Sequence, residues 1–206
     1  MRMRKKKNLP SRMERASAWL LRDEGDIRRD KDKKLIAELG CGMGTFACET
    51  ALARPDTEVF ALERVPDAII AGMERAMREN IKNLRFIQDD AANLPRYFSA
   101  NEIDELYIHF CDPWSHWKQA GRRLVARNFL KIYRPLLAIP GKSGDTGFLK
   151  FKTDDGPLFT FAQKELAAAG WTIIHCDPDS PPEAIMTEYE KKFRSQKIPI
   201  GSLTAI

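Results

Sequence analysis

The sequence predicts an α/β fold in which helices cover both faces of a mostly parallel sheet. Beyond residue 34, short apolar segments of strand length alternate with segments whose apolar residues recur at helical spacing. Such alternation is the pattern of parallel strands joined by crossover helices. With 206 residues, the chain is expected to form one domain over residues 35–206, preceded by a basic and partly flexible arm over residues 1–34.

The expected elements follow one another in a regular order, and the helix over residues 67–80 is the clearest. Its apolar residues Ile69, Ile70, Met73 and Met77 lie close to 3.6 residues apart. Strands are expected at residues 35–39, 58–62, 84–88, 105–110, 147–152, 171–176 and 198–206. The remaining helices are expected at residues 45–53, 122–133 and 157–169, with Gly170 as a C′ glycine, and the patch 16–21 in the arm also fits a helix.

The positive charge of the chain is concentrated in two places. The formal net charge is +5, yet residues 1–34 hold 13 lysines and arginines against six acidic residues. Residues 113–144 hold seven basic residues and no acidic one. Two basic surfaces on an otherwise slightly acidic body indicate a polyanionic partner. A solvated terminus and an ordinary exposed helix explain the charges equally well.

Several classes of protein are excluded by what the sequence lacks. No apolar run approaches the roughly 20 residues that span a bilayer, and no apolar segment follows the charged N-terminus as in a secretory signal. The four cysteines form no Cys-x-x-Cys pair, which favours reduced thiols over disulfides or a zinc site. We therefore expect a cytoplasmic protein without a metal, and His109 and His175 are expected in the core because they fall within strands.

A glycine-rich loop follows the first strand of the domain. Gly40, Gly42 and Gly44 alternate along it, whereas the dinucleotide-binding fingerprint would need a glycine where Thr45 stands. Glu38 lies directly ahead of the loop, and a carboxylate there suits a cationic ligand better than a diphosphate. S-adenosylmethionine (SAM), which carries an ammonium and a sulfonium, is such a ligand.

Acidic residues also follow the next strands of the predicted sheet. Glu63 and Asp90 come at the ends of the second and third strands, and Asp112 follows the fourth. The carboxyl ends of parallel strands share one edge, where ligands of such sheets bind. An acid in the position of Glu63 can accept the ribose hydroxyls of an adenosine. The other interpretation is a glycine-rich turn with solvated acids.

Five motifs give the chain a resemblance to a known family. They are Met-Arg-Met-Arg at 1–4, Glu-Leu-Gly-Cys-Gly-Met-Gly at 38–44, Asp-Pro-Trp at 112–114 with Arg-Arg-Leu at 122–124, Lys-Thr-Asp at 152–154 and Thr-Glu-Tyr-Glu at 187–190. In this order they resemble the bacterial tRNA (guanine-N7-)-methyltransferase family. The resemblance implies a Rossmann-like class I SAM-dependent methyltransferase fold with a seven-stranded sheet. It also implies methylation of guanosine N7 at position 46, in the variable loop of tRNA.

The resemblance further implies the roles of individual residues. Asp112 would be catalytic, and SAM would be bound by Glu38, Gly40, Gly42, Gly44, Glu63, Asp90 and Asp112. The tRNA would be bound by His116, Lys118, Arg122, Arg123, Asp154, Thr187, Glu188, Tyr189 and Glu190. His116 departs from the family, which usually has a lysine there, while Trp117 beside it can stack on a base. No obligate protein partner is expected, and the chain is expected to be a monomer or a homodimer.

The chemistry of N7 methylation explains why acids would suffice. Guanine N7 carries a free lone pair, so no general base is needed, and carboxylates would stabilise the cationic species. We expect Asp112 at the sulfonium end, and Asp154 or Glu188 on the N1–H and N2–H groups of guanine. Asp155 is the better candidate for a helix N-cap, and Thr187 with Glu190 also forms a capping box.

Three rival functions share parts of the pattern. A nicotinamide-dependent oxidoreductase would share the fold, and a non-catalytic RNA-binding protein would share the basic surfaces. The closest rival is a SAM-dependent methyltransferase that acts on another RNA or on an exocyclic amine. Amine-specific enzymes often carry Asn/Asp-Pro-Pro-Tyr where this chain has Asp-Pro-Trp, which weighs against an amine.

Overall fold

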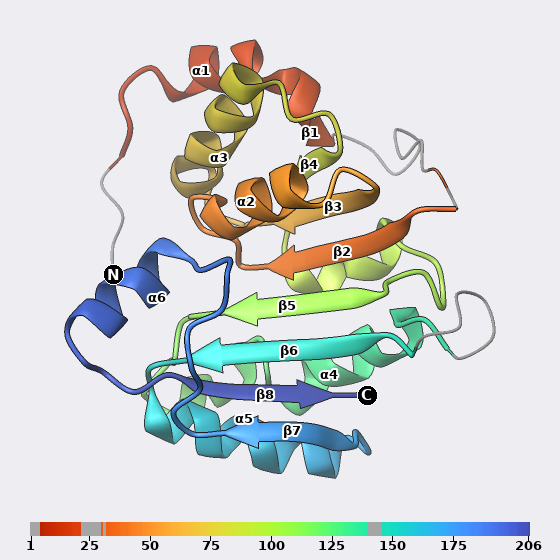
Figure 1. The fold of residues 1–206 in the computed structure, drawn as a ribbon, viewed down its shortest axis with the longest axis vertical. Coiled ribbons are helices and arrows are strands. Elements are labelled where there is room, and N and C mark those ends of the chain that lie inside the picture. The colour runs from red at the N-terminus through yellow and green to blue at the C-terminus, as the bar shows by residue number, and fades with distance from the viewer. Residues whose placement is uncertain (1–4, 22–29, 31, 140–145) are drawn as a thin grey trace.

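An eight-stranded sheet forms the centre of the molecule (Figure 1). The structure is a computed structural model and describes residues 5–21, 30, 32–139 and 146–206. The strand order is β1-β4-β3-β2-β5-β6-β8-β7, and β8 alone runs antiparallel to its neighbours among the described strands. The strands are β1 (Leu20–Leu21), β2 (Lys34–Leu39), β3 (Thr57–Leu62), β4 (Leu84–Ile87), β5 (Glu105–His109), β6 (Phe148–Thr153), β7 (Ile173–Asp177) and β8 (Gly201–Ala205).

Helices cover both faces of this sheet, as expected. The α-helices are α1 (Leu9–Arg15), α2 (Thr45–Ala53), α3 (Pro66–Glu79), α4 (Arg127–Tyr133), α5 (Gly156–Ala168) and α6 (Glu188–Ser195). Short 3-10 helices in the described part of the chain are η1 (Ser17–Trp19), η3 (Ala91–Arg96), η4 (Trp117–Arg122) and η5 (Arg134–Leu136). None of the helices in the described residues is both long and apolar enough to cross a bilayer.

Side-chain alternation along the strands divides the core into two clusters. Leu35, Ala37 and Leu39 of β2 pack with residues of η3, α4 and α5, whereas Ile36 packs with residues of α2 and α3. Successive side chains of a strand point to opposite faces, so each inner strand serves both clusters. In Figure 1 the helices α2 and α3 lie in front of the sheet and α5 lies behind it.

The structure differs from the expected elements at several places, among them the arm, where residues 9–15 form the helix α1 that was not predicted. The patch 16–21 forms the short helix η1 and the strand β1, which pairs with β4 and gives eight strands instead of seven. The helix expected at 122–133 is shorter, because the backbone is extended at Arg123 and α4 begins only at Arg127. The arm is also docked in part, since Arg12 in α1 pairs with Glu74 in α3 at 2.5 Å.

The order of strands reverses between β2 and β5, and this reversal positions the candidate site. From β2 the chain builds outward through β3 and β4, and then returns to place β5 on the other side of β2. A crevice at such a switch point is where open parallel sheets bind ligands. Figure 1 shows α6 at the same edge, beside the carboxyl ends of β2 and β5.

Candidate functional site

The glycine loop bends tightly around the end of β3. Gly40, Gly42 and Gly44 all have positive φ, between 55° and 71°. The N–H groups of Gly40 and Cys41 both donate to the carbonyl oxygen of Leu62, at 2.8 and 3.0 Å. A Cβ on Gly44 would lie 2.8 Å from the ring of Phe86. Glycine is therefore required at Gly44 by both conformation and space, and the loop leads directly into α2.

Glu38 is a buried carboxylate at the switch point. Glu38 is 2% exposed, and its Oε2 has no hydrogen-bond partner among the described residues. Its Oε1 lies 3.6 Å from Nδ1 of His109, which is also buried. Burial raises the pKa of Glu38 well above its usual value, and the carboxylates of Glu188 and Glu63 act in the same direction. An unpartnered buried acceptor among other acids favours a cationic ligand.

Glu63 connects the end of β3 to the glycine loop. Its Oε2 accepts from the N–H of Gly42 at 3.1 Å, and its Oε1 accepts from the N–H of Val65 at 2.8 Å. A carboxylate has about four lone-pair directions, so both oxygens can still accept further hydrogen bonds. The side chain is half-buried, and its position suits the predicted contact with a ribose.

The two acids after β4, Asp89 and Asp90, differ in their hydrogen-bond partners. Asp89 accepts from the backbone N–H of Asp90, from Asn93 and from the hydroxyl of Tyr97, so it fixes the turn. Asp90 caps η3 by accepting from the N–H of Ala92 at 3.0 Å, and it lies 3.5 Å from Arg64. Of this acidic pair, Asp90 is thus the residue with an open carboxylate edge for a ligand.

The Asp-Pro-Trp segment after β5 has an unusual backbone. Phe110 and Trp114 have φ values of 51° and 41°, which bulky residues rarely adopt. Arg123 holds this shape, because its guanidinium donates to the carbonyl oxygens of Pro113 and Trp114 at 2.8 and 3.1 Å. Backbone strain of this kind costs about 1–3 kcal/mol per residue and clusters at functional sites.

Arg123 and Arg122 therefore play different parts. Arg123 is engaged by the Asp-Pro-Trp backbone and packs over the ring of Phe161 at 4.3 Å, so the structure gives it a supporting role not anticipated from sequence. Arg122 is exposed, with its guanidinium 5.2 Å from the ring centre of Trp114. His116 and Lys118 are exposed as well.

Helix α6 brings the Thr-Glu-Tyr-Glu motif to the same place. Thr187 caps the helix by accepting from the N–H of Glu190 at 3.0 Å, which is the Thr187 half of the predicted capping box, whereas the Glu190 carboxylate pairs with Lys152 and Arg194. The ring of Phe110 lies 6.5 Å from that of Tyr189. Burial raises the pKa of Tyr189, and the carboxylates of Glu188, Asp112 and Glu63 add to the effect. These acids, which come from different elements, therefore surround one tyrosine.

Glu190 is buried and paired within the protein, whereas a direct contact with the substrate needs an accessible side chain. It is 1% exposed, and its carboxylate pairs with Lys152 at 3.1 Å and with Arg194 at 2.7 Å. Lys152 is itself 1% exposed at the end of β6. The pair attaches α6 to the sheet, which explains why the motif contains this second acid. The spacing of four residues between Glu190 and Arg194 was the sequence signal that could have indicated their ion pair on the helix.

Three further expectations can be compared with the structure. Asp112 is exposed in the free protein, although it follows a buried strand and was expected at the sulfonium end of the ligand. His109 is buried as expected, but His175 is exposed on the edge strand β7. Asp155 caps α5 by accepting from the N–H of Leu158 at 2.6 Å, and Asp154 beside it is half-buried at the end of β6.

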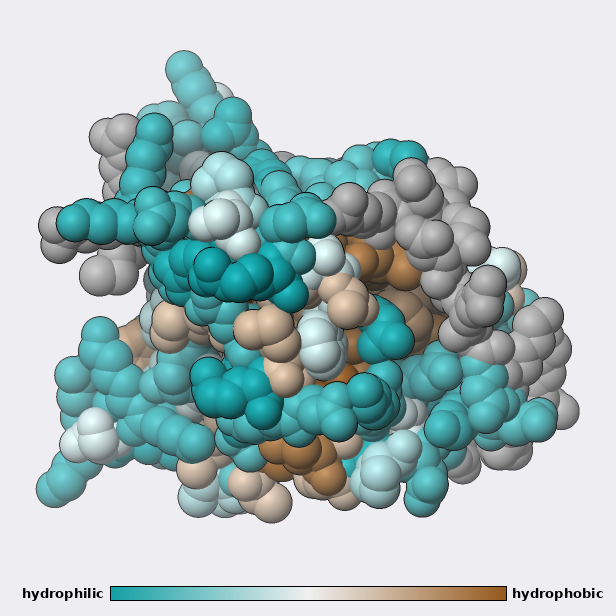
Figure 2. All heavy atoms as spheres, turned by 90° about the horizontal axis from the view of Figure 1, so that it is seen from above, coloured by the Kyte–Doolittle hydropathy of each residue, from teal (hydrophilic) through white to brown (hydrophobic). Residues whose placement is uncertain are grey.

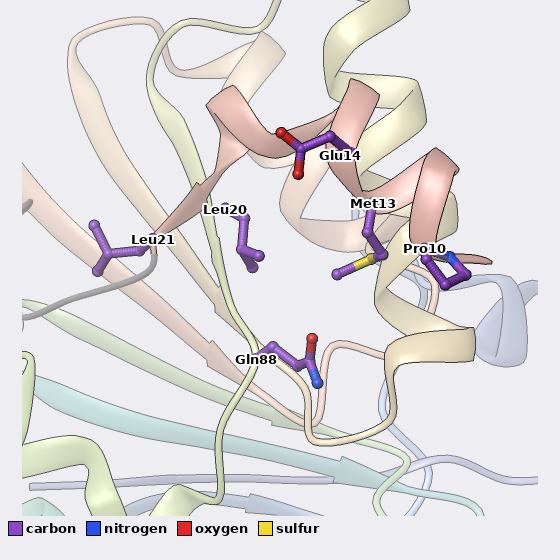
Figure 3. A pocket seen from close by; sticks show the side chains of 6 residues that line it. All are labelled: Pro10, Met13, Glu14, Leu20, Leu21 and Gln88. Carbon is purple, nitrogen blue, oxygen red and sulfur yellow. The ribbon is translucent and has the colours of Figure 1, made fainter.

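A cavity of about 380 Å³ lies between α1 and the end of β4 (Figure 3). Pro10, Met13 and Glu14 of α1 line it together with Leu20, Leu21 and Gln88. Seen from this end of the molecule, the surface is mainly hydrophilic, with apolar side chains visible in a hollow (Figure 2). None of the predicted cofactor residues lines the cavity.

The residues at the switch point fit SAM. The glycine loop permits close approach of a ligand, Glu38 offers an unpartnered acceptor for an ammonium group, and Glu63 offers acceptors for ribose hydroxyls. Among the described residues, no cluster of three or more His, Cys, Asp or Glu could hold a metal ion.

Comparison with solved structures defines the class. The 16S rRNA methyltransferase KamB superposes with a TM-score of 0.63 at 16% identity, covering 98% of this chain and 94% of that one. The 16S rRNA (adenine(1408)-N(1))-methyltransferase from Catenulisporales acidiphilia gives a TM-score of 0.61 at 16% identity, covering 99% and 95%. The fold is therefore that of SAM-dependent methyltransferases, and the acidic switch point agrees with it.

Sequence comparison then defines the family. A family model described as "Putative methyltransferase" matches residues 32–203. The tRNA (guanine-N(7)-)-methyltransferase of Clostridioides difficile (strain 630) is 33% identical over 207 residues, which cover 95% of this chain and 94% of that protein. Its counterpart in Macrococcus caseolyticus (strain JCSC5402) is 35% identical over 180 residues, covering 85% and 83%. The chain belongs to the tRNA (guanine-N7-)-methyltransferase family.

Proposed function

We propose that this protein transfers a methyl group from SAM to N7 of a guanosine in tRNA, at position 46 of the variable loop, in the cytoplasm. One observation carries the proposal. The carboxylates of Glu63 and Glu188 act on the buried carboxylate of Glu38 at the switch point, and the carboxylate of Asp112 joins them in acting on Tyr189. Arg122 lies over Trp114 in the Asp-Pro-Trp segment that carries Asp112. Such a site suits a cationic donor and a polyanionic acceptor together.

The chain's own groups divide into a donor side and an acceptor side. Glu38 would hold the ammonium of the donor, Glu63 its ribose and Asp90 the edge of its adenine, while Gly40, Gly42 and Gly44 let the backbone come close. When bound, SAM supplies a methyl group on a cationic sulfur, and the N7 lone pair takes that methyl as the carbon–sulfur bond breaks. No side chain needs to remove a proton beforehand, because the lone pair is free at neutral pH.

The acceptor side must place guanine and stabilise the charge that develops on it. Asp112 lies at the rim between the two sides, where its carboxylate would stabilise the positive charge as it passes to the purine. Asp154 or Glu188 would accept the N1–H and N2–H groups, which adenine cannot offer in the same pattern. Tyr189 is 42% exposed beside them and would bound the base, with Thr187 capping the helix that presents it.

His116, Lys118 and Arg122 form the exposed edge of the acceptor side. Lys118 and Arg122 would meet phosphates, and His116 stands where the family usually has a lysine. Arg123 and Glu190 support the site from within, because their charged groups are already engaged by the protein.

The decisive experiment identifies the product. The purified chain is incubated with labelled SAM and an unmodified tRNA transcript, and the digested nucleosides are analysed by mass spectrometry. We expect 7-methylguanosine, absent from a transcript whose variable-loop guanosine at position 46 is replaced by adenosine. A methylated adenosine or an N2-methylated guanosine would instead support the rival that acts on another atom, and no methylated nucleoside would overturn the proposal.

Two adjacent residues test the assignment of Asp154. Asp154→Ala is expected to raise the KM for tRNA at least about tenfold, the effect of losing roughly 1.4 kcal/mol of binding, with an unchanged Kd for SAM. Asp155→Ala is the matched control, since it removes the cap of α5 and should cost about 0.5–2 kcal/mol of stability without raising that KM. Equal tRNA kinetics in the two variants would refute the role of Asp154.

A further inference from the structure

Trp117 is the most exposed large apolar side chain of the described residues, at 76%. The other three tryptophans are partly or fully buried. Trp19 donates to the carbonyl oxygen of Ile81, Trp114 lies beneath Arg122, and Trp171 is buried. A tryptophan left in water at the rim of a binding site is costly unless something covers it.

The short helix η4 presents this indole in a defined position. Its N-terminus is capped by His116, whose Nδ1 accepts from the N–H of Lys118 at 3.2 Å. The carbonyl oxygen of His116 also accepts from the N–H of Gln119 at 2.9 Å. At the other end, Arg123 bonds the carbonyls of the Asp-Pro-Trp segment. Helix η4, which carries Trp117, is therefore attached to the segment that carries Asp112.

The surroundings of the indole indicate which kind of partner covers it. Lys118 places its ammonium 5.5 Å from the ring centre of Trp117, and the His116 ring lies nearly parallel at 6.3 Å. The sequence holds no acidic residue from 113 to 144. An apolar protein partner would require further apolar side chains around the indole, whereas an aromatic ring beside a lysine in a segment without acids is typical of single-stranded nucleic-acid sites.

We propose that Trp117 stacks on an unpaired nucleobase of the substrate RNA that flanks the target guanosine, while Lys118 neutralises a neighbouring phosphate. This inference rests on the proposed function, since it names a contact of the same RNA. Stacking would hold the strand beside the rim without reading its sequence, because every base has a stacking face.

Salt dependence separates stacking from charge. Trp117→Ala is expected to weaken tRNA binding about 5- to 100-fold with the same dependence of affinity on salt as the unaltered chain. Trp117→Phe should recover most of the affinity. Lys118→Ala is the matched control, because losing one phosphate contact should reduce the salt slope by about one. Wild-type affinity in Trp117→Ala would overturn the proposal, as would a salt slope reduced in that variant.

An RNA lesion tests the contact directly. Abasic sites are placed on each side of the target guanosine, and binding is measured without methyl transfer. For one of these positions, the lesion and Trp117→Ala should weaken binding by similar factors and show no further loss when combined. Fully multiplicative losses at both flanking positions would contradict stacking. Because binding is measured separately, a failure to form 7-methylguanosine would refute the proposed function while leaving this result interpretable.

Discussion

Glu38 and His109 are polar residues of the candidate site whose burial lowers the stability of the free protein. Both are buried, and Glu38 Oε2 and both ring nitrogens of His109 have no hydrogen-bond partner among the described residues. Burial raises the pKa of Glu38 and lowers the pKa of His109, with Lys152 and Lys150 adding to the latter. An unsatisfied buried polar group costs about 1–3 kcal/mol, so this arrangement favours ligand binding over stability of the free protein.

Glu38→Gln should therefore stabilise the free protein at pH 8 by about 1–3 kcal/mol while abolishing SAM binding. The raised pKa of Glu38 means that its folded form keeps a proton which the unfolded form releases above about pH 4.5. Its contribution to stability is thus present at low pH and lost as pH rises. Urea unfolding at pH 5 and pH 8, with calorimetric titration of SAM, measures both effects. A variant less stable than wild type at pH 8 would contradict this account.

Arg123 shows the opposite case, a charged residue used for support. Arg123→Ala should remove two charge-assisted hydrogen bonds to the strained Asp-Pro-Trp backbone and cost about 1.5–3 kcal/mol. We expect the Tm to fall by several degrees and kcat to fall more than the affinity for tRNA. The adjacent exposed Arg122→Ala is the control, which should leave the Tm nearly unchanged and weaken tRNA binding. Thermal unfolding and steady-state kinetics on both variants distinguish the two roles.

At the scale of elements, the relation of α6 to β6 depends on buried charges. Lys152 lies between Glu190 at 3.1 Å and Glu183 at 3.4 Å, and Arg194 completes the network. A buried ion pair is weak evidence for net stabilisation, but removal of one partner leaves an uncompensated charge. The network therefore fixes where α6 sits and, with it, the position of Tyr189 beside Phe110.

Lys152→Met should thus destabilise the protein by about 3–5 kcal/mol and raise the KM for tRNA. Adding Glu190→Gln should restore part of the stability, because the charge left unpaired is removed. Urea unfolding of both single variants and the double variant gives the coupling energy. Additive losses in the double variant would show that the two side chains do not depend on each other.

At the scale of the whole molecule, the N-terminal segment has a docked part and a charged part. The segment from α1 to β1 packs on α3 and β4, through the Arg12–Glu74 pair and the Trp19 hydrogen bond. The basic residues at 2–7 precede this docked part. The docked part belongs to the fold, and Lys6 ahead of α1 is also held, since its backbone N–H donates to Asp67 at 2.6 Å.

Deletion of residues 2–7 should therefore weaken tRNA binding and flatten its salt dependence, with little change in SAM affinity. Deletion of residues 2–21 should in addition lower the Tm, since it exposes the edge of β4 and apolar residues such as Ile81 and Leu84. Binding measured at several salt concentrations, together with thermal unfolding, tests both deletions. An unchanged salt slope after the shorter deletion would mean that the arm does not contact the RNA backbone.

The parts of this protein that sequence alone could determine are those set by local pattern. Helix α2 lies at the expected residues, Asp155 and Thr187 cap the helices they were expected to cap, and Gly170 has a positive φ just after α5. Periodicity, capping and glycine conformation involve neighbours within a few residues, so a single sequence carries them. The shared edge at which these strands end was also predictable, because parallel strands place their carboxyl ends together.

Contacts between distant segments were decided only by the tertiary structure. Pairing of β1 with β4, engagement of Arg123 by residues nine and ten positions earlier, and burial of Glu190 against Lys152 all join parts of the chain that no short pattern relates. The sequence alone does not show whether a charged residue faces water or a buried partner. Its role follows from the packing around it, and packing exists only once the whole sheet has formed.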